Sequence, residues 1–346
     1  MKKIINTIVM ISALAVMLCG CQKSENKKIS KQGFYFDTII QITLYGTDDE
    51  QYINDCFDIA GKYEKMLSNT IDDSDISRIN KAAGEQAVCV SDETVSLIQK
   101  GIEYGRLSGG KFDITIGELS NLWNFPEIAE NSKSDDNEAD SSVIPSDEKI
   151  DEYLGHVDYN KIKIDGNNVM ITDEKTQIDL GGIAKGYIAD KMKEYLKSKK
   201  VTSGIINLGG NVLTIGSKSD GSDYTVGIQK PFDRSGASIA TIKVDDRSVV
   251  TSGIYERYYR VDGKIYHHIL DTQTGYPVEN DLYSVTIISD SSCDGDALST
   301  TCFALGKDKA EEFIKSMDGV EAIFVDNKMN VTCSDENMQI DILDER

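Results

Sequence analysis

The sequence has few cysteines, and they are not arranged as disulfide or metal-binding cysteines usually are. It holds seven, none in a CxxC pair, and the five that follow residue 21 are widely scattered. This spacing supports neither a disulfide framework nor a zinc site. We therefore expect them to be mostly buried small hydrophobic residues; they are Cys56, Cys89, Cys293, Cys302 and Cys333.

Other common signatures are missing too. After residue 20 no segment is long and apolar enough to span a membrane, and we detect no sequence repeat, P-loop or GxGxxG stretch. Positive charge is scarce: the net charge is −21, and removing residues 1–20, which hold two lysines and no acid, makes it −23. Such a surface argues against nucleic acid as a partner, and an anionic ligand would need a local cation or metal.

The N-terminus has the pattern of an export signal. Lys2 and Lys3 precede an apolar run from Ile4 to Leu18, which is followed by a small residue and Cys21. This arrangement resembles a bacterial lipobox and implies lipidation of Cys21, although an ordinary signal peptide is the alternative. We expect residues 1–20 to be a lipoprotein signal peptide and residues 21–32 a flexible tether. The protein would then lie on the extracytoplasmic face of the cell membrane, held by its lipid anchor only.

Residues 33–346 have the length and pattern of one large domain. Helical spacing spans Glu50–Leu67 and Ser91–Ser108, with Ser91 as N-cap, while Phe34–Tyr45 has the composition of a strand. Helices and hairpins alternate without a regular βαβ order, which predicts an α+β fold of mixed, largely antiparallel sheets with packed helices. Residues 127–152 hold ten acids and two lysines, and we interpret them as a solvated acidic insertion.

The stretch Asp179–Asp190, DLGGIAKGYIAD, is the first candidate site. Its glycines permit a tight turn and a close approach of backbone to a ligand, and Lys185 falls in the first turn of the helix that follows. The amides exposed at a helix start favour an anion, so the stretch is compatible with phosphate binding. Taken alone, a glycine turn beside a solvated lysine is the simpler interpretation.

Two further stretches carry polar groups suited to chemistry. His267 and His268 precede Asp271, and because adjacent residues of a strand point to opposite faces, at most one histidine is expected to serve a site. Asp296 and Thr300 are four residues apart, so their oxygens share one helix face and can bind Mg²⁺. Capping of the helix by Asp294 or Asp296 is the alternative.

In combination, these stretches resemble the ApbE-type flavin transferases, which are FAD:protein FMN transferases. Eight stretches occur in the order of that family over essentially the whole mature chain, and together they are far more specific than any one alone. They are FDTIIQITLYG, LSNTIDDSDISRIN, SGGKFDITIGELSNLWNF, DLGGIAKGYIAD, INLGGNV, VGIQKPF, TSGIYERYYRVDGKIYHHILDTQTGYPV and CDGDALSTTCFALG.

The resemblance implies a role for particular residues. Mg²⁺, or Mn²⁺ as the alternative ion, would be held by the carbonyl of Gly182, the carboxylate of Asp296 and the hydroxyl of Thr300. His268 would assist acid–base chemistry, with Asp271 as a second catalytic candidate. Two departures from the family pattern are Thr70, where an aromatic residue is common, and Thr272, where proline is usual. The positions that would contact FAD are Phe36, Thr70, Lys111, Phe112, Asp113, Asp179, Lys185 and Ile254.

The implied reaction is Mg²⁺-dependent transfer of FMN from FAD to a threonine or serine hydroxyl of an acceptor protein, with release of AMP. The resemblance also implies acceptors with FMN-binding domains, of the kind found in Rnf and Nqr electron-transfer complexes. Two alternatives remain open. An FAD pyrophosphatase would use water as the acceptor, and a non-enzymatic flavin-binding lipoprotein would bind FAD with or without the metal.

Overall fold

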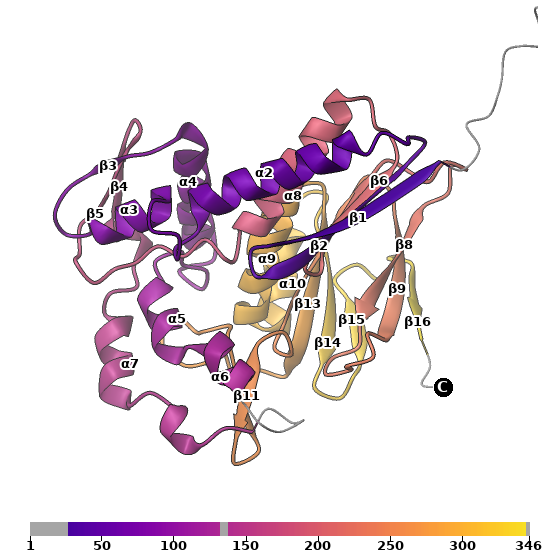
Figure 1. Ribbon diagram of the computed structural model, residues 1–346. Helices are drawn as coiled ribbons and strands as arrows, with labels where there is room; N and C mark the ends of the chain where they lie inside the picture. Colours follow the sequence, from indigo (N-terminus) through magenta and orange to yellow (C-terminus); the bar gives the residue numbers. More distant parts are fainter. Residues whose placement is uncertain (1–26, 132–137, 344–346) are drawn as a thin grey trace, which may run out of the picture.

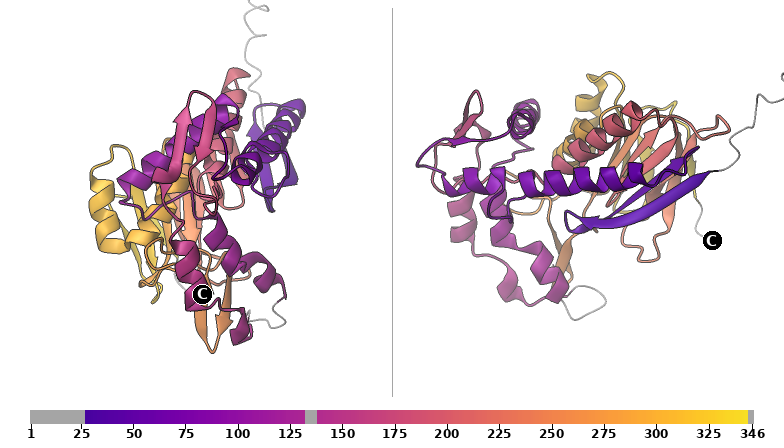
Figure 2. Two further views of the ribbon diagram at one scale, coloured as in Figure 1. Left: turned by 90° about the vertical axis from the view of Figure 1, so that its left-hand side faces the viewer. Right: turned by 45° about the horizontal axis from the view of Figure 1, so that its top comes forward.

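In the computed structural model the described residues are 27–131 and 138–343. The predicted signal peptide, Cys21 and residues 22–26 of the predicted tether therefore lie outside the described residues. The prediction of a flexible tether is wrong for residues 28–32, because they belong to the strand Lys28–Tyr35, which pairs with the strand that follows it. A large antiparallel sheet forms the centre, with helices on one face and a smaller sheet on the other (Figures 1 and 2). Among the described helices, none combines the length and apolar character needed to cross a bilayer.

The large sheet has eight strands in the order β1-β2-β6-β7-β10-β13-β14-β15. Its side chains alternate between two cores, as strand geometry requires: Ile287 faces the core under the helices, and Ile288 faces the core under the small sheet. The strands are β1 (Lys28–Tyr35), β2 (Thr38–Tyr45), β6 (Gly204–Leu208), β7 (Asn211–Ile215), β10 (Ser248–Gly253), β13 (Leu282–Ser289), β14 (Glu321–Asp326) and β15 (Val331–Cys333).

Three smaller β units surround this sheet. The sheet β16-β9-β8 covers its second face, and the β3-β5-β4 sheet and the β11-β12 hairpin stand apart from it. The strands are β3 (Val88–Cys89), β4 (Ile162–Asp165), β5 (Asn168–Ile171), β8 (Tyr224–Gln229), β9 (Ser238–Val244), β11 (Tyr258–Val261), β12 (Lys264–His267) and β16 (Ile340–Ile342).

Helices α8 and α9 pack together against the large sheet, and α2 lies beside α8. Ser91 caps α4 as predicted, its hydroxyl accepting from the Thr94 amide, whereas α9 is capped by Ser291 rather than by Asp294 or Asp296. The helices are α2 (Gln51–Leu67), α3 (Asp75–Lys81), α4 (Asp92–Leu107), α5 (Gly117–Trp123), α6 (Phe125–Asn131), α7 (Asp147–Leu154), α8 (Ala184–Ser198), α9 (Ser292–Leu305) and α10 (Lys307–Lys315), with 3₁₀ turns η1 (Ser141–Val143) and η2 (Tyr159–Lys161).

A third, aromatic core holds the lower part of the molecule together. Trp123 is fully buried, stacks on Phe125 with ring centroids 5.6 Å apart, and donates its indole N–H to the Gly275 carbonyl at 2.8 Å. Ile150 of α7 is buried in the same core. The expectation that residues 127–152 are simply solvated is therefore wrong for α7, because Ile150 is buried in that core and Tyr153 and Leu154 pack against it.

The predicted fold class is confirmed: mixed helices and antiparallel sheets form one large domain. The prediction of a single strand over Phe34–Tyr45 is wrong, since the chain reverses at Phe36 and Asp37 to form the β1-β2 hairpin. Both turn residues have positive φ, of 53° and 54°. Three of the five cysteines, Cys56, Cys293 and Cys302, are buried as expected, but Cys89 is exposed and Cys333 is partly exposed.

Candidate active site

A cleft of about 840 Å³ brings together segments that are far apart in the sequence. This volume lies in the range of small-molecule and cofactor sites. Two of the predicted site residues, Asp271 and Ile254, do not line it. The predicted residues that do line it are Phe36, Thr70, Lys111, Phe112, Asp113, Asp179, Gly182, Lys185, His268, Asp296 and Thr300.

The start of α8 forms one part of the cleft. Asp179 closes the preceding turn, because its carboxylate accepts from the Gly181 amide at 2.7 Å. At Gly182 an added Cβ would lie 3.1 Å from the Phe112 ring and 3.9 Å from the Thr300 hydroxyl, so the bare backbone is what fits there. Lys185 donates to the Gly181 carbonyl at 2.9 Å, which holds its ammonium group over the turn.

Helix α9 brings the predicted metal-binding oxygens to the same place. The Asp296 side chain is almost completely buried, and its Oδ2 accepts from the Gly186 amide at 3.0 Å. Its Oδ1 lies 3.8 Å from the Lys185 ammonium. The Thr300 hydroxyl is 3.2 Å from that of Ser252, which also lines the cleft. Lys185, Gly182, Asp296 and Thr300 thus meet around one cleft, as the sequence predicted.

Helices α8 and α9 cap each other through aspartates. Asp296 of α9 accepts from the first turn of α8, while Asp190 of α8 accepts from the amides of Ser292 and Cys293, both at 2.9 Å, at the start of α9. Helix starts favour negative charge, so each carboxylate stabilises the other helix. Gly186 permits this contact, because a Cβ there would lie 2.1 Å from the Ser292 carbonyl oxygen. The aspartate that ends the DLGGIAKGYIAD stretch therefore has a structural role.

The donor set fits a hard divalent cation. A carboxylate oxygen, a hydroxyl and a backbone carbonyl are oxygen ligands of the kind that Mg²⁺ prefers, and Mg²⁺ usually completes its shell with water and phosphate oxygens. Asp296 Oδ1 has no partner closer than the Lys185 ammonium at 3.8 Å among the described residues. Nowhere in the described part of the chain do three or more His, Cys, Asp or Glu residues gather as a metal site.

Lys111 and Asp271 are joined in a tight ion pair. The Lys111 ammonium lies 2.9 and 3.1 Å from the two carboxylate oxygens, and Asp271 also accepts from the Gln273 amide at 2.8 Å. Thr272, where the family pattern has proline, donates its hydroxyl to the Gly110 carbonyl at 2.5 Å. These contacts join two loops, and they use the oxygens that a catalytic role for Asp271 would need.

His268 is the histidine that lines the cleft, whereas His267 points into the core. Nδ1 of His268 lies 3.2 Å from the Arg257 carbonyl oxygen, so Nδ1 carries the hydrogen and Nε2 holds the free electron pair. Desolvation, His267 and Arg257 lower the pKa of His268 to about 3, which keeps the ring neutral at pH 7. The expectation that only one of the two histidines serves the site agrees with this placement.

The remaining predicted residues differ in their surroundings. Asp113 is buried and accepts from Thr115 and from the Tyr159 amide, and burial raises the pKa of its carboxyl. Ile254 is buried outside the cleft lining, with its amide bonded to the Tyr283 carbonyl. Phe36 lies at the turn of the β1-β2 hairpin, and its backbone amide donates a hydrogen bond to the Glu64 carboxylate.

Some residues of the cleft were missed from the sequence. Ser252, Glu256 and Asn211 all line it. Desolvation raises the pKa of the Glu256 carboxyl, and the positive charges of Arg257 and Lys185 partly offset this rise. Ser252 and Glu256 lie in the TSGIYER stretch and Asn211 lies in INLGGNV, so the motifs did mark the right segments. They gave no sign of which side chains face inward.

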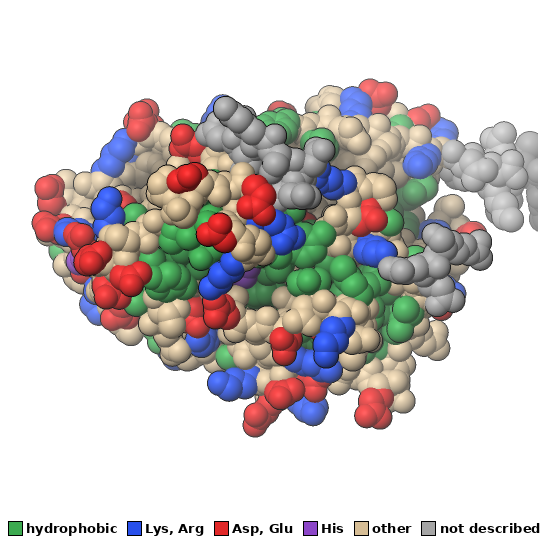
Figure 3. All heavy atoms as spheres, turned by 90° about the horizontal axis from the view of Figure 1, so that it is seen from below, with side chains coloured by type: hydrophobic (Ala, Val, Ile, Leu, Met, Phe, Trp, Pro, Cys, Tyr) green, Lys and Arg blue, Asp and Glu red, His purple; other side chains and the backbone are tan. Residues whose placement is uncertain are grey.

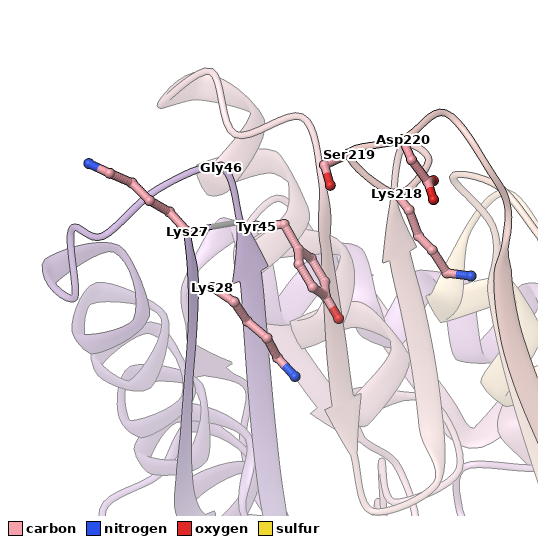
Figure 4. A pocket seen from close by; sticks show the side chains of 7 residues that line it. All are labelled: Lys27, Lys28, Tyr45, Gly46, Lys218, Ser219 and Asp220. Atoms are coloured by element: carbon pink, nitrogen blue, oxygen red, sulfur yellow. The ribbon is translucent and has the colours of Figure 1, made fainter. Parts of the chain in front are cut away.

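A second, smaller hollow of about 250 Å³ lies at the N-terminal end of β1 (Figure 4). Three lysines line it: Lys27 pairs with Asp48 at 2.6 Å, Lys28 lies over the Tyr45 ring, and Lys218 lies on the opposite side of the hollow, beside Asp220. No residue predicted for the site borders it.

Figure 3 shows that acidic and basic side chains are interspersed around a hydrophobic band on one face of the molecule. The net negative charge of the protein therefore does not exclude local positive groups.

Comparison with known proteins agrees with this arrangement. The model of the ApbE family matches residues 36–324, a span that includes every predicted site residue apart from Cys21. The chain belongs to the ApbE family. The resemblance inferred from eight sequence stretches is therefore confirmed.

Individual relatives within the ApbE family cover nearly the whole chain. A Klebsiella pneumoniae (strain 342) protein named FAD:protein FMN transferase is 35% identical over 313 residues, covering 90% of this chain and 93% of the relative. A Treponema pallidum (strain Nichols) protein of the same name is 29% identical and covers 91% of this chain and 90% of the relative. The crystal structure of an ApbE protein from Thermotoga maritima superposes with a TM-score of 0.79 at 32% identity, covering 88% of this chain and 96% of that one.

Proposed function

We propose that this chain transfers FMN from FAD to a threonine or serine hydroxyl of an acceptor protein and releases AMP. The predicted class, a flavin transferase, is confirmed by the curated relatives. The observation that carries the finer proposal is the convergence of Lys185, Asp296, Thr300 and a neutral His268 on one cleft of suitable volume. FAD is the substrate, and its pyrophosphate is the anion that this strongly acidic protein has to accommodate.

Mg²⁺, or Mn²⁺ in its place, would be held by the Gly182 carbonyl, Asp296 and Thr300. The ion would act as a Lewis acid that neutralises charge on the two phosphates of FAD. The orientation of Asp296 toward it does not depend on the ion, because the Gly186 amide already fixes the carboxylate. The proposal therefore predicts that the cleft is largely preformed.

The protein's own groups supply binding and proton transfer. Lys185 binds phosphate oxygens, because it is a positive group in a partly buried site and its nearest carboxylate, that of Asp296, lies 3.8 Å away. Nε2 of His268 takes the proton from the acceptor hydroxyl. The hydroxyl oxygen then forms a bond to the FMN phosphorus, the bond from that phosphorus to the bridging oxygen breaks, and AMP leaves with the electron pair.

We propose that the reaction takes place outside the cytoplasm, with the chain anchored through lipidated Cys21. The signal-like sequence of residues 1–20 supports this location. The acceptors would be membrane-bound subunits with FMN-binding domains, as in Rnf- and Nqr-type complexes. The parent protein should incorporate a labelled fatty acid and a Cys21→Ser variant should not, and equal labelling of the two would contradict lipid anchoring at Cys21.

The function is tested by incubating the full chain with FAD, Mg²⁺ and an FMN-binding acceptor domain. We expect flavin fluorescence on the acceptor that survives denaturing electrophoresis, together with one AMP per flavin transferred and no reaction in EDTA. A matched acceptor whose target threonine is replaced by alanine is the control. AMP released at the same rate without acceptor would indicate the pyrophosphatase, and recovery of intact FAD would indicate a binding protein.

A further inference from the structure

Asn211 stands out among the cleft residues that the reaction above does not use. It is the first residue of β7, immediately after the Gly209-Gly210 turn, and its side chain is 2% exposed. It nevertheless borders the cleft. A buried amide beside a ligand site needs hydrogen-bond partners for both its oxygen and its nitrogen.

The Asn211 amide has a partner on one side only. Its Oδ1 accepts from the Ser292 hydroxyl at 2.7 Å. Its Nδ2 is buried and, within the described residues, has no hydrogen-bond partner. Turning the amide over would only exchange the two atoms, because Ser292 would still be the one contact. Burying such a group without a partner is costly, so the missing partner points to a ligand.

The surroundings indicate what that ligand offers. The backbone amide of Ser292 donates a hydrogen bond to Asp190, which fixes the position of Ser292. Ser292, Asp296 and Thr300 follow one another at intervals of four residues, so they lie on one face of α9. The Asn211 amide is therefore anchored about one helical turn, or about 6 Å along the helix axis, from the proposed metal ligand Asp296. The groups next along this row are those that would hold the pyrophosphate.

We propose that Asn211 Nδ2 donates a hydrogen bond to a pyrophosphate oxygen of FAD. An amide N–H is a neutral donor with a second hydrogen, so it adds an anion contact without adding charge next to Asp296. In the observed orientation the Ser292 hydroxyl donates to Oδ1, which leaves Nδ2 as the atom available to the phosphate. This contact deepens the proposed function and rests on it.

The test measures ligand affinity and not turnover. The full chain and its N211A and N211D variants are titrated, in the presence of Mg²⁺, with FAD, with ADP, and with riboflavin, which has no phosphate. Loss of a hydrogen bond to a charged group should weaken FAD and ADP binding by about 10- to 100-fold in N211A. N211D should lose more, because it places a second carboxylate near the phosphates. Riboflavin binding should stay within about twofold.

Ser248 provides a matched control. Its hydroxyl is also buried without a partner among the described residues, but it does not border the cleft. S248A should therefore bind FAD like the parent protein. Thermal unfolding shows whether each variant is folded. If N211A does not fold, the FAD affinity of N211D, which keeps the shape of the side chain, tests the inference instead.

Three results would overturn the inference. If N211A and N211D both bind FAD within twofold of the parent, the amide has no ligand role. If riboflavin binding falls as much as FAD binding, Asn211 contacts the flavin or its ribityl chain and not the phosphates. If S248A weakens FAD binding as much as N211A does, the effect is general to the core. Failure of the parent protein itself to bind FAD would instead contradict the proposed function.

Discussion

Two lysines that line this cleft are each paired with an aspartate, and the two pairs differ in the distance between their charged groups. The Lys111 ammonium lies 2.9 and 3.1 Å from the oxygens of Asp271, within hydrogen-bond distance of both. The Lys185 ammonium lies 3.8 Å from Asp296, beyond that range. The first pair satisfies its own charges, whereas the second keeps a cation and an anion side by side with capacity left for a ligand.

The second partner of each carboxylate explains the difference. Asp271 accepts from the Gln273 amide in its own turn, so it stabilises a loop. Asp296 accepts from the Gly186 amide on a neighbouring helix, so its position depends on how α8 and α9 pack. Lysine and aspartate thus form a close ion pair in one region and a looser pair, at the proposed phosphate site, in the other. The sequence alone does not show which of these two arrangements a given lysine and aspartate adopt.

The sharpest test of this comparison replaces each aspartate by asparagine. D296N should lower transfer activity by at least about 100-fold, because the charge proposed to hold the metal ion is lost while the shape of the side chain is kept. D271N should keep most of the activity and lose mainly stability. Both are measured as AMP release with acceptor present. Equal losses in the two variants would show that Asp271 also acts in catalysis and that the distinction is wrong.

The helix contact behind Asp296 is tested at Gly186. G186A would place a methyl group about 2.1 Å from the Ser292 carbonyl oxygen, so α8 and α9 must separate. We expect a loss of about 3 kcal/mol or more in the free energy of unfolding, measured with denaturant. The control is G61A in α2, where the nearest atom is 3.4 Å away and alanine favours the helix. If G186A is as stable as G61A, the close contact does not hold the helices.

The two lysines should give smaller and opposite effects. K185M removes the cation that is proposed to bind phosphate, so FAD affinity should fall by about tenfold while thermal stability changes little. K111M breaks the ion pair with Asp271, so the midpoint of thermal unfolding should fall while FAD affinity changes by less than about threefold. Flavin fluorescence titration and thermal unfolding separate the two outcomes. A larger loss of affinity in K111M than in K185M would reverse the assignment.

A pH dependence of stability is expected from the two histidines. Burial lowers the pKa of His267 to about 4 and that of His268 to about 3, below the ordinary value of 6.5. The unfolded chain therefore binds protons more readily, so the free energy of unfolding should fall as the pH drops from about 6.5 toward 4. H268Q should show a shallower slope over this range in denaturant titrations. A slope identical to that of the parent would mean that His268 does not contribute.

Much of the site could be predicted because it is built from local signals. The glycines and lysine before α8, and the spacing of four between Asp296 and Thr300, each fix a geometry within one or two helical turns. That Lys111 pairs with Asp271 could not be predicted, since 160 residues separate them and either has other charged residues as candidate partners. Which side chain of INLGGNV faces the cleft was equally hidden, because it depends on the packing of β7 against α9.

The errors in the fold have physical reasons as well. The hairpin turn at Phe36 and Asp37 uses left-handed backbone without the glycine or asparagine that usually marks such a turn. The helix α7 was missed because the acidic composition of residues 127–152 concealed Ile150, its single fully buried residue. The turn is held by the hydrogen bond from the Phe36 amide to Glu64, and α7 is held by the packing of Ile150, Tyr153 and Leu154.

The position of Trp123 gives this protein a built-in optical reporter. It is the only tryptophan in the sequence, it is fully buried, and the adjacent Phe125 borders the cleft. Its emission therefore comes from one known place, and an isoalloxazine ring bound nearby would absorb that energy. Occupancy of the cleft can thus be followed in unlabelled protein, with light absorbed by a single side chain.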